Sequence, residues 1–345
     1  MARVHPFQTN FTAGELTPKL HGQVDFKKYN NGVEELKNMT VFPQGGCTRR
    51  YGSRFVCEVK DSTKTTRLIP FEFNITQAYI LEFGDQYIRF FKDGGQITEA
   101  NKTITAITKA NPAVVTSNSH GYSNGDHVWI NSVGGMTRLN GRRFVVAGVT
   151  TNTFQLQGEN STNYDSYTSG GTAAKVYEIA SPFTESMLFN INFTQSADVM
   201  YIVEESLKPR KLTRTGHTSW TLSEVDFKRG PYLDQNTSST TMQPSGTSGS
   251  VTITASSSTF ASTDVGRLIK IKDGHAKITA YSSGTSVTAT TTDNFANTNA
   301  ETEWSLGAWC SAKGYPRTVS FFEQRLVFGG STAYPQTIWA SESGL

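Results

Sequence analysis

FTAGELTPKLHGQVDFKKYNNGVEELKNMTVFPQGGCTRRYGSRF, residues 11–55, contains the one helix expected in an otherwise strand-rich sequence. Within residues 25–39, four apolar side chains recur at spacings of three and four, as on one face of a helix: Phe26, Tyr29, Val33 and Leu36. The predicted N-terminal helix is too short to be stable alone, so its apolar face should dock on another surface. Pro43, Gly45 and Gly46 should end it in a backbone turn, because proline lacks an amide donor and glycine adopts positive φ at little cost.

Beyond this segment the sequence alternates between apolar and polar residues, as in half-buried strands. Residues 66–97 contain two apolar-rich arms on either side of Gly84 and Asp85, which predicts a β-hairpin. The chain has 345 residues, of which 36% are hydrophobic and 18% are charged. This composition, with its many Ser, Thr, Asn and Gly residues, predicts a folded all-β protein and excludes a disordered chain.

Comparable strand units recur at residues 198–212 and 325–339. Their separations become regular if residues 101–175 and 231–306 are insertions, since the remaining period of roughly 45 to 50 residues matches a four-stranded propeller blade. We therefore expect a propeller-like platform with two inserted small β-barrel or sandwich modules. The expected domains are an N-terminal segment with the first platform strands (1–100), a β-module (101–175), platform strands (176–230), a second β-module (231–306) and further platform strands (307–345).

The two insertions differ in how they begin. The first contains short apolar runs separated by turn residues such as Asn140 and Gly141, as in a small β-barrel. The second begins with NTSSTTMQPSGTSGS, residues 236–250, whose Gly, Ser and Thr content predicts a flexible linker.

Two blocks, NFTAGELTPKL at residues 10–20 and VFPQGGCTRRYGSRFV at residues 41–56, resemble the tail nozzle or tail tubular proteins of short-tailed bacteriophages. The resemblance covers residues 11–89 and returns at 317–344. It implies a structural virion protein that forms a ring, a hexamer, below the head-to-tail connector, with DNA leaving through the ring. Members of that family continue beyond the point where this chain stops, so we expect either a truncated form or a platform closed by another element.

A second resemblance lies inside the first insertion. Residues 112–158, which begin PAVVTSNSHGYSNGDHVWI, resemble the first catalytic cysteine half-domain of ubiquitin-activating enzymes, a module also found in phage tail proteins. No adenylation motif and no catalytic cysteine accompany it, so ubiquitin chemistry is not implied.

Candidate catalytic groups are few. Gly121, Ser123 and Gly125 match the G-x-S-x-G nucleophile pattern, but the strand before the serine and the helix after it are missing from the sequence pattern, which favours a turn. The three cysteines form no C-x-x-C pair, and the six histidines lack metal-ligand spacing. Nucleotide-binding motifs are absent as well. We therefore expect no catalytic residue, no metal, no cofactor and no enzymatic activity.

The charge balance of 32 basic against 29 acidic residues is too even to imply nucleic-acid affinity for the whole surface. Arg49, Arg50 and Arg54 form the one basic cluster of the opening segment. They could pair with carboxylates of a neighbouring subunit or meet phosphates of DNA in transit, since guanidinium groups suit both. A solvated strand end is the competing interpretation.

The resemblance implies a structural protein of the phage tail. We expect it to be assembled in the host cytoplasm, because no signal peptide or apolar run of roughly 20 residues is present. Its expected partners are copies of itself, the connector or adaptor proteins and non-specific double-stranded DNA. The alternative is a tail protein that binds or degrades carbohydrate on the host surface. In that case exposed aromatic side chains of the modules could stack on sugar rings: Trp129, Tyr164, Tyr167 and Tyr281.

Overall fold

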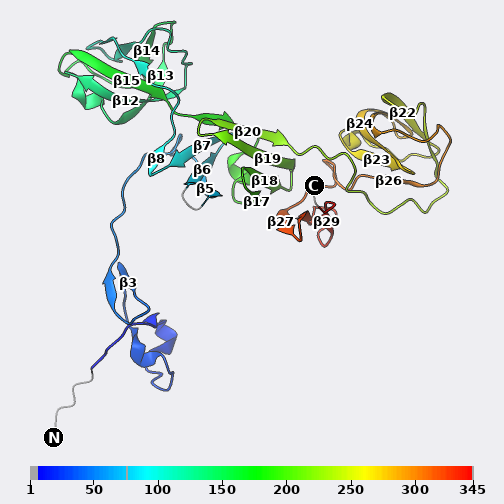
Figure 1. Cartoon of the computed structure of the whole chain (residues 1–345), viewed down its shortest axis with the longest axis horizontal. Helices are drawn as coiled ribbons and strands as arrows, with labels where there is room; N and C mark the ends of the chain where they lie inside the picture. The colour runs from blue at the N-terminus through cyan, green and yellow to red at the C-terminus, as the bar shows by residue number, and fades with distance from the viewer. Residues whose placement is uncertain (1–6, 75–76, 344–345) are drawn as a thin grey trace. The chain divides into compact units, whose positions relative to one another are not determined.

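The computed structural model describes residues 7–74 and 77–343 (Figure 1). The all-β prediction is confirmed: the described residues form strands β1 to β29, and each helix among them is a 3-10 turn of three residues. None of these helices is long and apolar enough to cross a membrane. By its internal contacts the chain separates into two compact units, residues 1–56 and residues 57–345.

The N-terminal unit contains two small pairs of strands. The first pair is parallel and the second is an antiparallel hairpin. Its elements are β1 (Gly14–Glu15), η1 (Pro18–Leu20), η2 (Tyr29–Asn31), β2 (Gly32–Val33), β3 (Met39–Val41) and β4 (Cys47–Arg49).

The predicted helix at residues 25–39 is wrong. The chain there makes the single turn η2 and then enters β2. Asn30, Asn31 and Gly32 interrupt the amphipathic pattern with poor helix formers. Gly32 also lies against Leu16, because a Cβ at Gly32 would come within 2.4 Å of the Leu16 Cγ atom. The apolar residues spaced by three and four therefore lie in a turn, a short strand and a loop, and not on one face of a helix.

The larger unit is built on three antiparallel sheets. The first has the order β16-β7-β6-β5, with β8 paired to β7, and the second has the order β17-β18-β19-β20. The third has the order β27-β28-β29. Their bounds are β5 (Arg67–Asn74), β6 (Gln77–Gly84), β7 (Tyr87–Lys92), β8 (Gly95–Gln96), β16 (Glu178–Ala180), β17 (Asn192–Ser196), β18 (Val199–Glu204), β19 (Leu207–Gly216), β20 (Ser219–Glu224), β27 (Thr318–Phe322), β28 (Arg325–Gly329) and β29 (Ile338–Ala340). One further turn, η4 (Glu185–Met187), connects β16 to β17.

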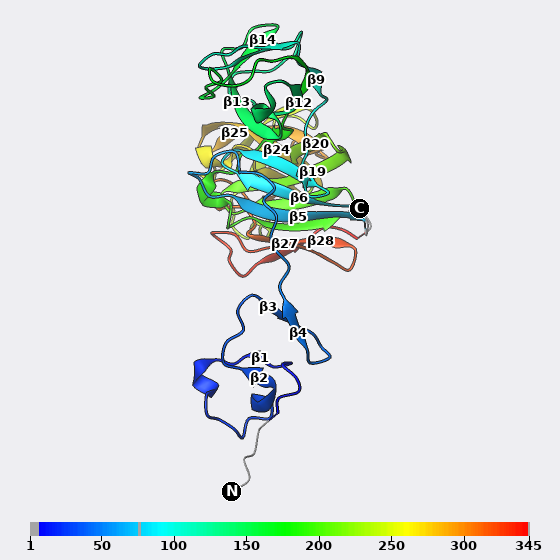
Figure 2. The same cartoon turned by 90° about the vertical axis from the view of Figure 1, so that its left-hand side faces the viewer.

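The first two sheets pack on each other through a shared apolar core, and the third packs against the second; Figure 2 looks at them with β5 and β6 in front. Trp220 of the second sheet packs against three aromatic rings of the first, with ring centroids 4.8 Å from Phe71, 5.3 Å from Tyr79 and 4.5 Å from Phe90. The third sheet, through residues such as Phe328, joins a core that also contains Val203 of the second. Buried apolar residues on alternate strand positions therefore hold the stack together.

Two further sheets are here called the first and second modules. Each is formed by one continuous segment of the chain, inserted between strands of the stack. The first module (residues 102–175) has the strand order β10-β11-β14-β13-β12-β15-β9, and the second (residues 242–306) has the order β21-β22-β25-β24-β23-β26. Each encloses its own apolar core. The elements are β9 (Lys102–Thr103), β10 (Ala106–Ile107), β11 (Val114–Thr116), β12 (His127–Gly134), η3 (Thr137–Leu139), β13 (Arg142–Ala147), β14 (Thr153–Leu156), β15 (Ser169–Lys175), β21 (Met242–Pro244), β22 (Ser250–Ala255), η5 (Ser262–Asp264), β23 (Leu268–Ile271), β24 (Gly274–Ser283), β25 (Ser286–Asp293) and β26 (Trp304–Leu306).

Residues 236–250, expected to be a flexible linker, contain β21. Met242 in this strand is fully buried, and β21 pairs with β22. A segment rich in Ser and Thr forms a strand here because its one large apolar residue completes the core of the second module.

Candidate functional site: the N-terminal unit and the first module junction

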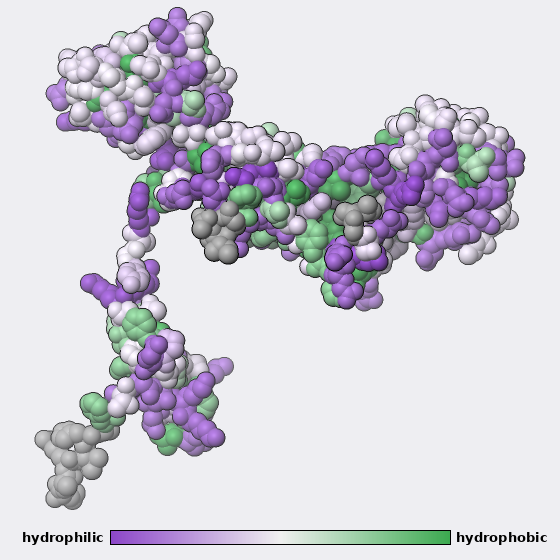
Figure 3. Space-filling model, in the orientation of Figure 1, coloured by the Kyte–Doolittle hydropathy of each residue, from purple (hydrophilic) through white to green (hydrophobic). Residues whose placement is uncertain are grey.

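The N-terminal unit has almost no core of its own. Among its described residues, Leu16 is the one large apolar side chain that is buried. Of the exposed large apolar side chains among the described residues, half belong to this unit, and Figure 3 shows apolar surface on it between polar residues. They are Phe7, Val24, Phe26, Met39, Phe42, Tyr51, Phe55 and Val56. Such exposure on a short segment marks an interaction surface.

The four apolar residues expected on one helical face have different surroundings. Tyr29 and Val33 line an open hollow of about 840 Å³ together with Phe7 and Leu16. Phe26 is 41% exposed and does not line it. Leu36 lies outside the hollow too, and its backbone N–H donates to the Glu15 carboxylate at 2.9 Å.

The predicted backbone turn residues lie between β3 and β4. The Phe42 N–H donates to the Gly46 carbonyl at 2.8 Å, and Pro43 falls inside this loop. Gly45 has a φ of 107° and accepts a hydrogen bond from the Phe11 N–H at 2.7 Å. Since a Cβ at Gly45 would come within 2.5 Å of the Asn10 Cβ atom, this position requires glycine.

The three arginines of the basic cluster are all exposed. Arg49 ends β4, and Arg50 and Arg54 follow it. In the described part of the chain, none of their guanidinium groups pairs with a carboxylate. Residues 1–56 contain eight Lys and Arg residues against four Asp and Glu residues, whereas the remaining residues contain 24 against 25. The positive charge of the chain is therefore concentrated in the N-terminal unit.

A second candidate site lies where the first module meets the first sheet. The module is attached by a two-stranded antiparallel stem, in which the Glu99 N–H donates to the Lys175 carbonyl at 2.7 Å and the Tyr177 N–H donates to the Ile97 carbonyl at 3.0 Å. Thr98 pairs with Val176 between these bonds.

Beside this stem, a row of charged side chains crosses the first sheet. The register places Glu82 next to Arg89 and Arg89 next to Glu178 on three neighbouring strands. Arg89 is only 1% exposed, and its Nε donates to Glu178 at 2.8 Å. Lys60 reaches the other oxygen of Glu178 at 2.6 Å, and the Tyr87 hydroxyl donates to Glu82 at 2.5 Å. The charges of a buried row are thus nearly matched, as burial requires.

The surroundings shift the pKa values of two groups in this row, the Glu178 carboxyl and the Tyr87 hydroxyl. Burial acts to raise the pKa of the Glu178 carboxyl, but Lys60 and Arg89 outweigh burial and hold that pKa below its usual value. Burial and then the Glu82 carboxylate raise the pKa of the Tyr87 hydroxyl above its usual range. Both groups therefore keep one protonation state across neutral pH.

His127, the first residue of β12, faces this row. It lines a hollow of about 340 Å³ with Lys60, Asp85 and Tyr87. Burial, and then the positive charge of Arg89, lower the pKa of His127 to about 4. A neutral imidazole beside a matched ion network is suited to holding the module in place; no nucleophile–base pair is formed among these residues.

The residues with motif-like patterns have structural roles. The Ser123 N–H donates to the Asp126 carboxylate at 2.8 Å, within a turn that leads into β12. His120 is buried against Tyr122 and Phe154, and its Nδ1 accepts the Tyr122 N–H at 3.0 Å. The three cysteines are free thiols, and the described residues contain no group of three or more His, Cys, Asp or Glu side chains that could hold a metal ion.

Three of the four aromatic residues considered for sugar stacking are half-buried. Tyr164 and Tyr167 pack on the core of the first module, and their hydroxyls donate to Glu159 at 2.6 Å and to the Gly170 carbonyl at 2.9 Å. Tyr281 is 39% exposed at the surface of the second module. The structure does not gather these rings into one site.

The ion row at the first junction was not predicted from the sequence. Glu82, Arg89 and Glu178 meet through strand register, and Glu178 lies beyond an insertion of more than 70 residues. The one available signal was a single arginine, Arg89, inside the apolar run of β7.

Residues 110–177 match the family described as ubiquitin-activating enzyme E1 FCCH domain, so the resemblance of the first insertion is confirmed and extends through β15. No curated protein matches the chain. Among solved structures, "Phage phi92 endosialidase" is 10% identical, and the match covers 82% of this chain and 59% of that chain. The TM-score of 0.17 does not indicate a common fold. The chain spans about three fifths of that protein's length.

Proposed function

We propose that this chain is a structural, non-enzymatic subunit of a phage tail: a nozzle ring below the head-to-tail connector, through which double-stranded DNA leaves without sequence-specific contacts. The observation that carries this proposal is the N-terminal unit, whose large apolar side chains, as far as they are described, are exposed or half-buried with the exception of Leu16. Such a segment needs a partner surface to become stable. The sequence resemblance of residues 11–89 and 317–344 to the nozzle family supports the same role.

The partner surface belongs to a second copy of this chain. A segment that docks on the neighbouring copy makes a head-to-tail contact, and such contacts close into rings. By resemblance the ring is a hexamer in the virion tail, assembled in the host cytoplasm, with connector or adaptor proteins at its ends. The exposed Arg49, Arg50 and Arg54 then lie at the subunit boundary or along the DNA channel, where guanidinium groups can bind carboxylates or phosphates.

The three stacked sheets supply successive blades of a propeller-like platform. Each sheet buries one or both faces on its neighbours, as blades do. Closed propellers have four or more blades, so closure requires at least one more sheet.

A second candidate is a carbohydrate-binding tail protein that contacts a host surface glycan. One observation favours it, a small aromatic pocket beside the second module that includes Trp309 and two lysines. The pocket has no pair of carboxylates arranged for glycoside hydrolysis, so binding is favoured over degradation.

The structural role is tested by light scattering on the full chain and two deletion variants. Removal of residues 1–56 should abolish the oligomer, because the docking segment is lost. Removal of residues 101–175 should leave the oligomer intact. The double substitution Tyr51→Ser with Phe55→Ser serves as a subtler version of the first deletion, with Phe322→Ser as the matched exposed control. The reverse pattern, or a full chain that is monomeric at every concentration, would contradict a self-assembling ring.

A further inference from the structure

The two modules have the same strand order. In the first module the order is β11-β14-β13-β12-β15, and in the second it is β22-β25-β24-β23-β26. Taken in chain order, the five strands of one set correspond one to one with the five of the other. All neighbouring pairs are antiparallel in both.

The registers agree at corresponding pairs of all four strand contacts. The pairs Val115–Phe154, Leu156–Val146, Phe144–Val128 and Val128–Lys175 of the first module correspond to Ile253–Val287, Ala289–Ile278, Ala276–Ile269 and Ile269–Leu306 of the second. Every member of these pairs is buried except Lys175, which is half-buried. The second module is therefore a second copy of the fold that the FCCH family match covers in the first.

The stems correspond as well. In the first stem the Val176 N–H donates to the His127 carbonyl at 2.8 Å, and in the second the Gly307 N–H donates to the Leu268 carbonyl at 2.7 Å. The bridge between Thr98 and Val176 has its counterpart between Tyr232 and Gly307. The space beside the stem of the first module can therefore be compared with the space beside the stem of the second module.

Beside the first stem, the positive charges are paired by the chain's own carboxylate. Glu178 lies two residues after Val176 and binds Lys60 and Arg89. In the second space, the residue two positions after Gly307 is Trp309. An aromatic side chain thus stands where the first junction has its anion.

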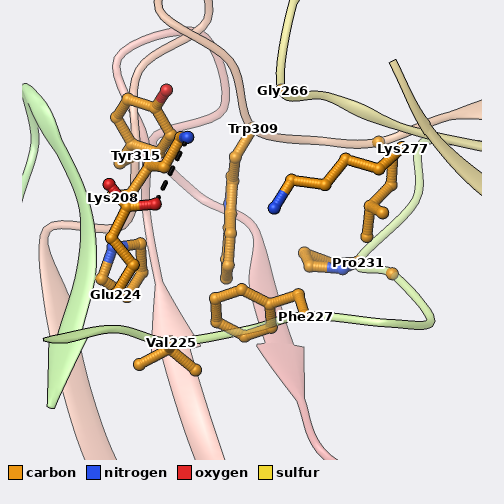
Figure 4. A pocket seen from close by; sticks show the side chains of 13 residues that line it. Lys208, Glu224, Val225, Phe227, Pro231, Gly266, Lys277, Trp309 and Tyr315 are labelled. Carbon is orange, nitrogen blue, oxygen red and sulfur yellow. Dashed lines mark hydrogen bonds and ion pairs between the residues drawn. The ribbon is translucent and has the colours of Figure 1, made fainter. Parts of the chain in front are cut away.

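The second space is a pocket of about 50 Å³ (Figure 4). Lys208 and Lys277 line it, and the Lys277 ammonium points toward the Trp309 indole. Lys208 is 3.4 Å from the Glu224 carboxylate, whereas Lys277 forms no ion pair with any described residue. The Trp309 Nε1 atom is buried and has no hydrogen-bond acceptor within the described chain. In this pocket the Lys277 cation therefore lacks an anionic partner, and next to it the buried Trp309 N–H lacks an acceptor.

We propose that this pocket binds the carboxylate of an acidic sugar. The carboxylate pairs with the Lys277 ammonium, which forms no ion pair with a described residue, and so supplies the negative charge that Glu178 supplies in the first junction. A volume of about 50 Å³ admits a carboxylate but not a whole sugar ring, so the ring lies at the open side. There the apolar rings of Phe227 and Pro231 can contact its C–H faces, and Glu224 can accept a hydroxyl hydrogen bond. The acceptor and the ring surfaces favour a sugar acid over a simple anion.

Calorimetric titration of the full chain tests this site with three probes: D-glucuronate, D-glucose and acetate. We expect D-glucuronate to bind in the millimolar range and the other two at least about tenfold more weakly, since each lacks either the carboxylate or the ring. Lys277→Gln should weaken D-glucuronate binding about tenfold, Lys277→Arg should retain most of it, and Lys270→Gln, on the neighbouring strand, should not change it.

Thermal unfolding of each variant checks that the module remains folded. Equal binding by Lys277→Gln, or no binding of D-glucuronate by the wild-type chain, would overturn the site. Acetate that binds as tightly as D-glucuronate would overturn the assignment to a sugar. These outcomes are independent of the oligomeric state, so failure here and failure of the ring can be told apart.

Discussion

Arg89 is the residue on which the first module junction depends. It is 1% exposed, and its Nε pairs with Glu178 while its Nη2 atom has no hydrogen-bond partner among the described residues. A buried guanidinium with incomplete pairing disfavours any additional positive charge nearby. His127 faces the same row, and burial, followed by the charge of Arg89, lowers its pKa.

At this scale we predict that His127 makes the first junction acid-sensitive. Its pKa is about 4 in the folded chain against 6.5 as the ordinary value, so the unfolded chain binds the proton more readily between these values. The resulting stability is fully present above about pH 6.5 and is lost as the pH falls toward 4. We expect a loss on the order of 1 to 2 kcal/mol, below the full value of 1.36 kcal/mol per pKa unit because the side chain is partly exposed.

Urea denaturation of wild type and His127→Gln across this pH range measures the effect. The variant should show a flatter profile, and the distant surface substitution Thr150→Ala should keep the wild-type slope. A His127→Gln profile as steep as that of the wild type would assign the acid sensitivity to other groups.

Single residues were predictable from the sequence where the local pattern was sufficient. Gly45 is an example, because a turn next to proline requires a residue that tolerates positive φ. Arg89 and Glu178 were not predictable, because their pairing depends on the register between β7 and β16. Trp309 was missed for the same reason, since its neighbours come from strands far apart in the sequence.

Among the elements, β20 has the largest role in joining the first two sheets. Its Trp220 is 6% exposed and contacts aromatic rings from β5, β6 and β7. The Trp220 Nε1 donates to the His217 carbonyl at 3.1 Å, which fixes the indole in the interface. Both sheets therefore share one core at this position.

We predict that Trp220→Ala lowers the free energy of unfolding by about 3 to 5 kcal/mol, because it opens a large cavity between two sheets. The matched control is Phe322→Ala, since Phe322 is an aromatic residue that is 65% exposed and should cost less than about 0.5 kcal/mol. Urea denaturation followed by intrinsic fluorescence gives both values. Equal effects of the two substitutions would show that the sheets do not stack through this residue.

The strands of the stack followed from alternation, because β6, β7 and β18 contain apolar runs that are buried on at least one face. The helix at residues 25–39 failed as a prediction because periodicity reports spacing and not burial. Phe26 is 41% exposed, and Tyr29 and Val33 line an open hollow, so no described surface of this unit covers the four residues together and stabilises a helix. The strand β21 was missed because its segment is mostly polar.

At the scale of the whole molecule, each module is attached to the stack through one narrow connection. The Leu233 N–H donates to the Leu306 carbonyl at 2.8 Å, and the Ala308 N–H donates to the Pro231 carbonyl at 2.9 Å. The core of the second module contains none of the residues that form the cores of the stack. The second module should therefore fold and unfold largely by itself.

We predict that replacing residues 234–305 by an Asn-Gly turn leaves the stack folded, because the two ends of the excised piece are adjacent antiparallel strands. Hydrogen exchange should give β6 and β18 the same protection as in the full chain, within about threefold. As a control, Ile278→Ala in the full chain should reduce protection in the second module and leave β6 unchanged. Loss of protection in β18 after the excision would show that the stack depends on the module.

The regular spacing of the strand units led to the prediction of repeated sheets with two insertions. The sequence did not predict which sheet packs on which, because this depends on which face of each strand is covered. Trp220 and Val203 belong to one sheet but to different cores, and alternation alone cannot say which neighbour each one meets.

The stems also affect how the gene for this chain can change by recombination. A module whose first and last residues are joined by a hydrogen bond of under 3 Å can be gained, lost or exchanged by in-frame recombination without moving the sheets on either side. Two such attachment points in one chain, already carrying copies of one fold with different pockets, provide positions where new surface specificities can be installed while the inner framework is inherited unchanged. The same two positions are suitable for displaying a foreign domain with adjacent termini.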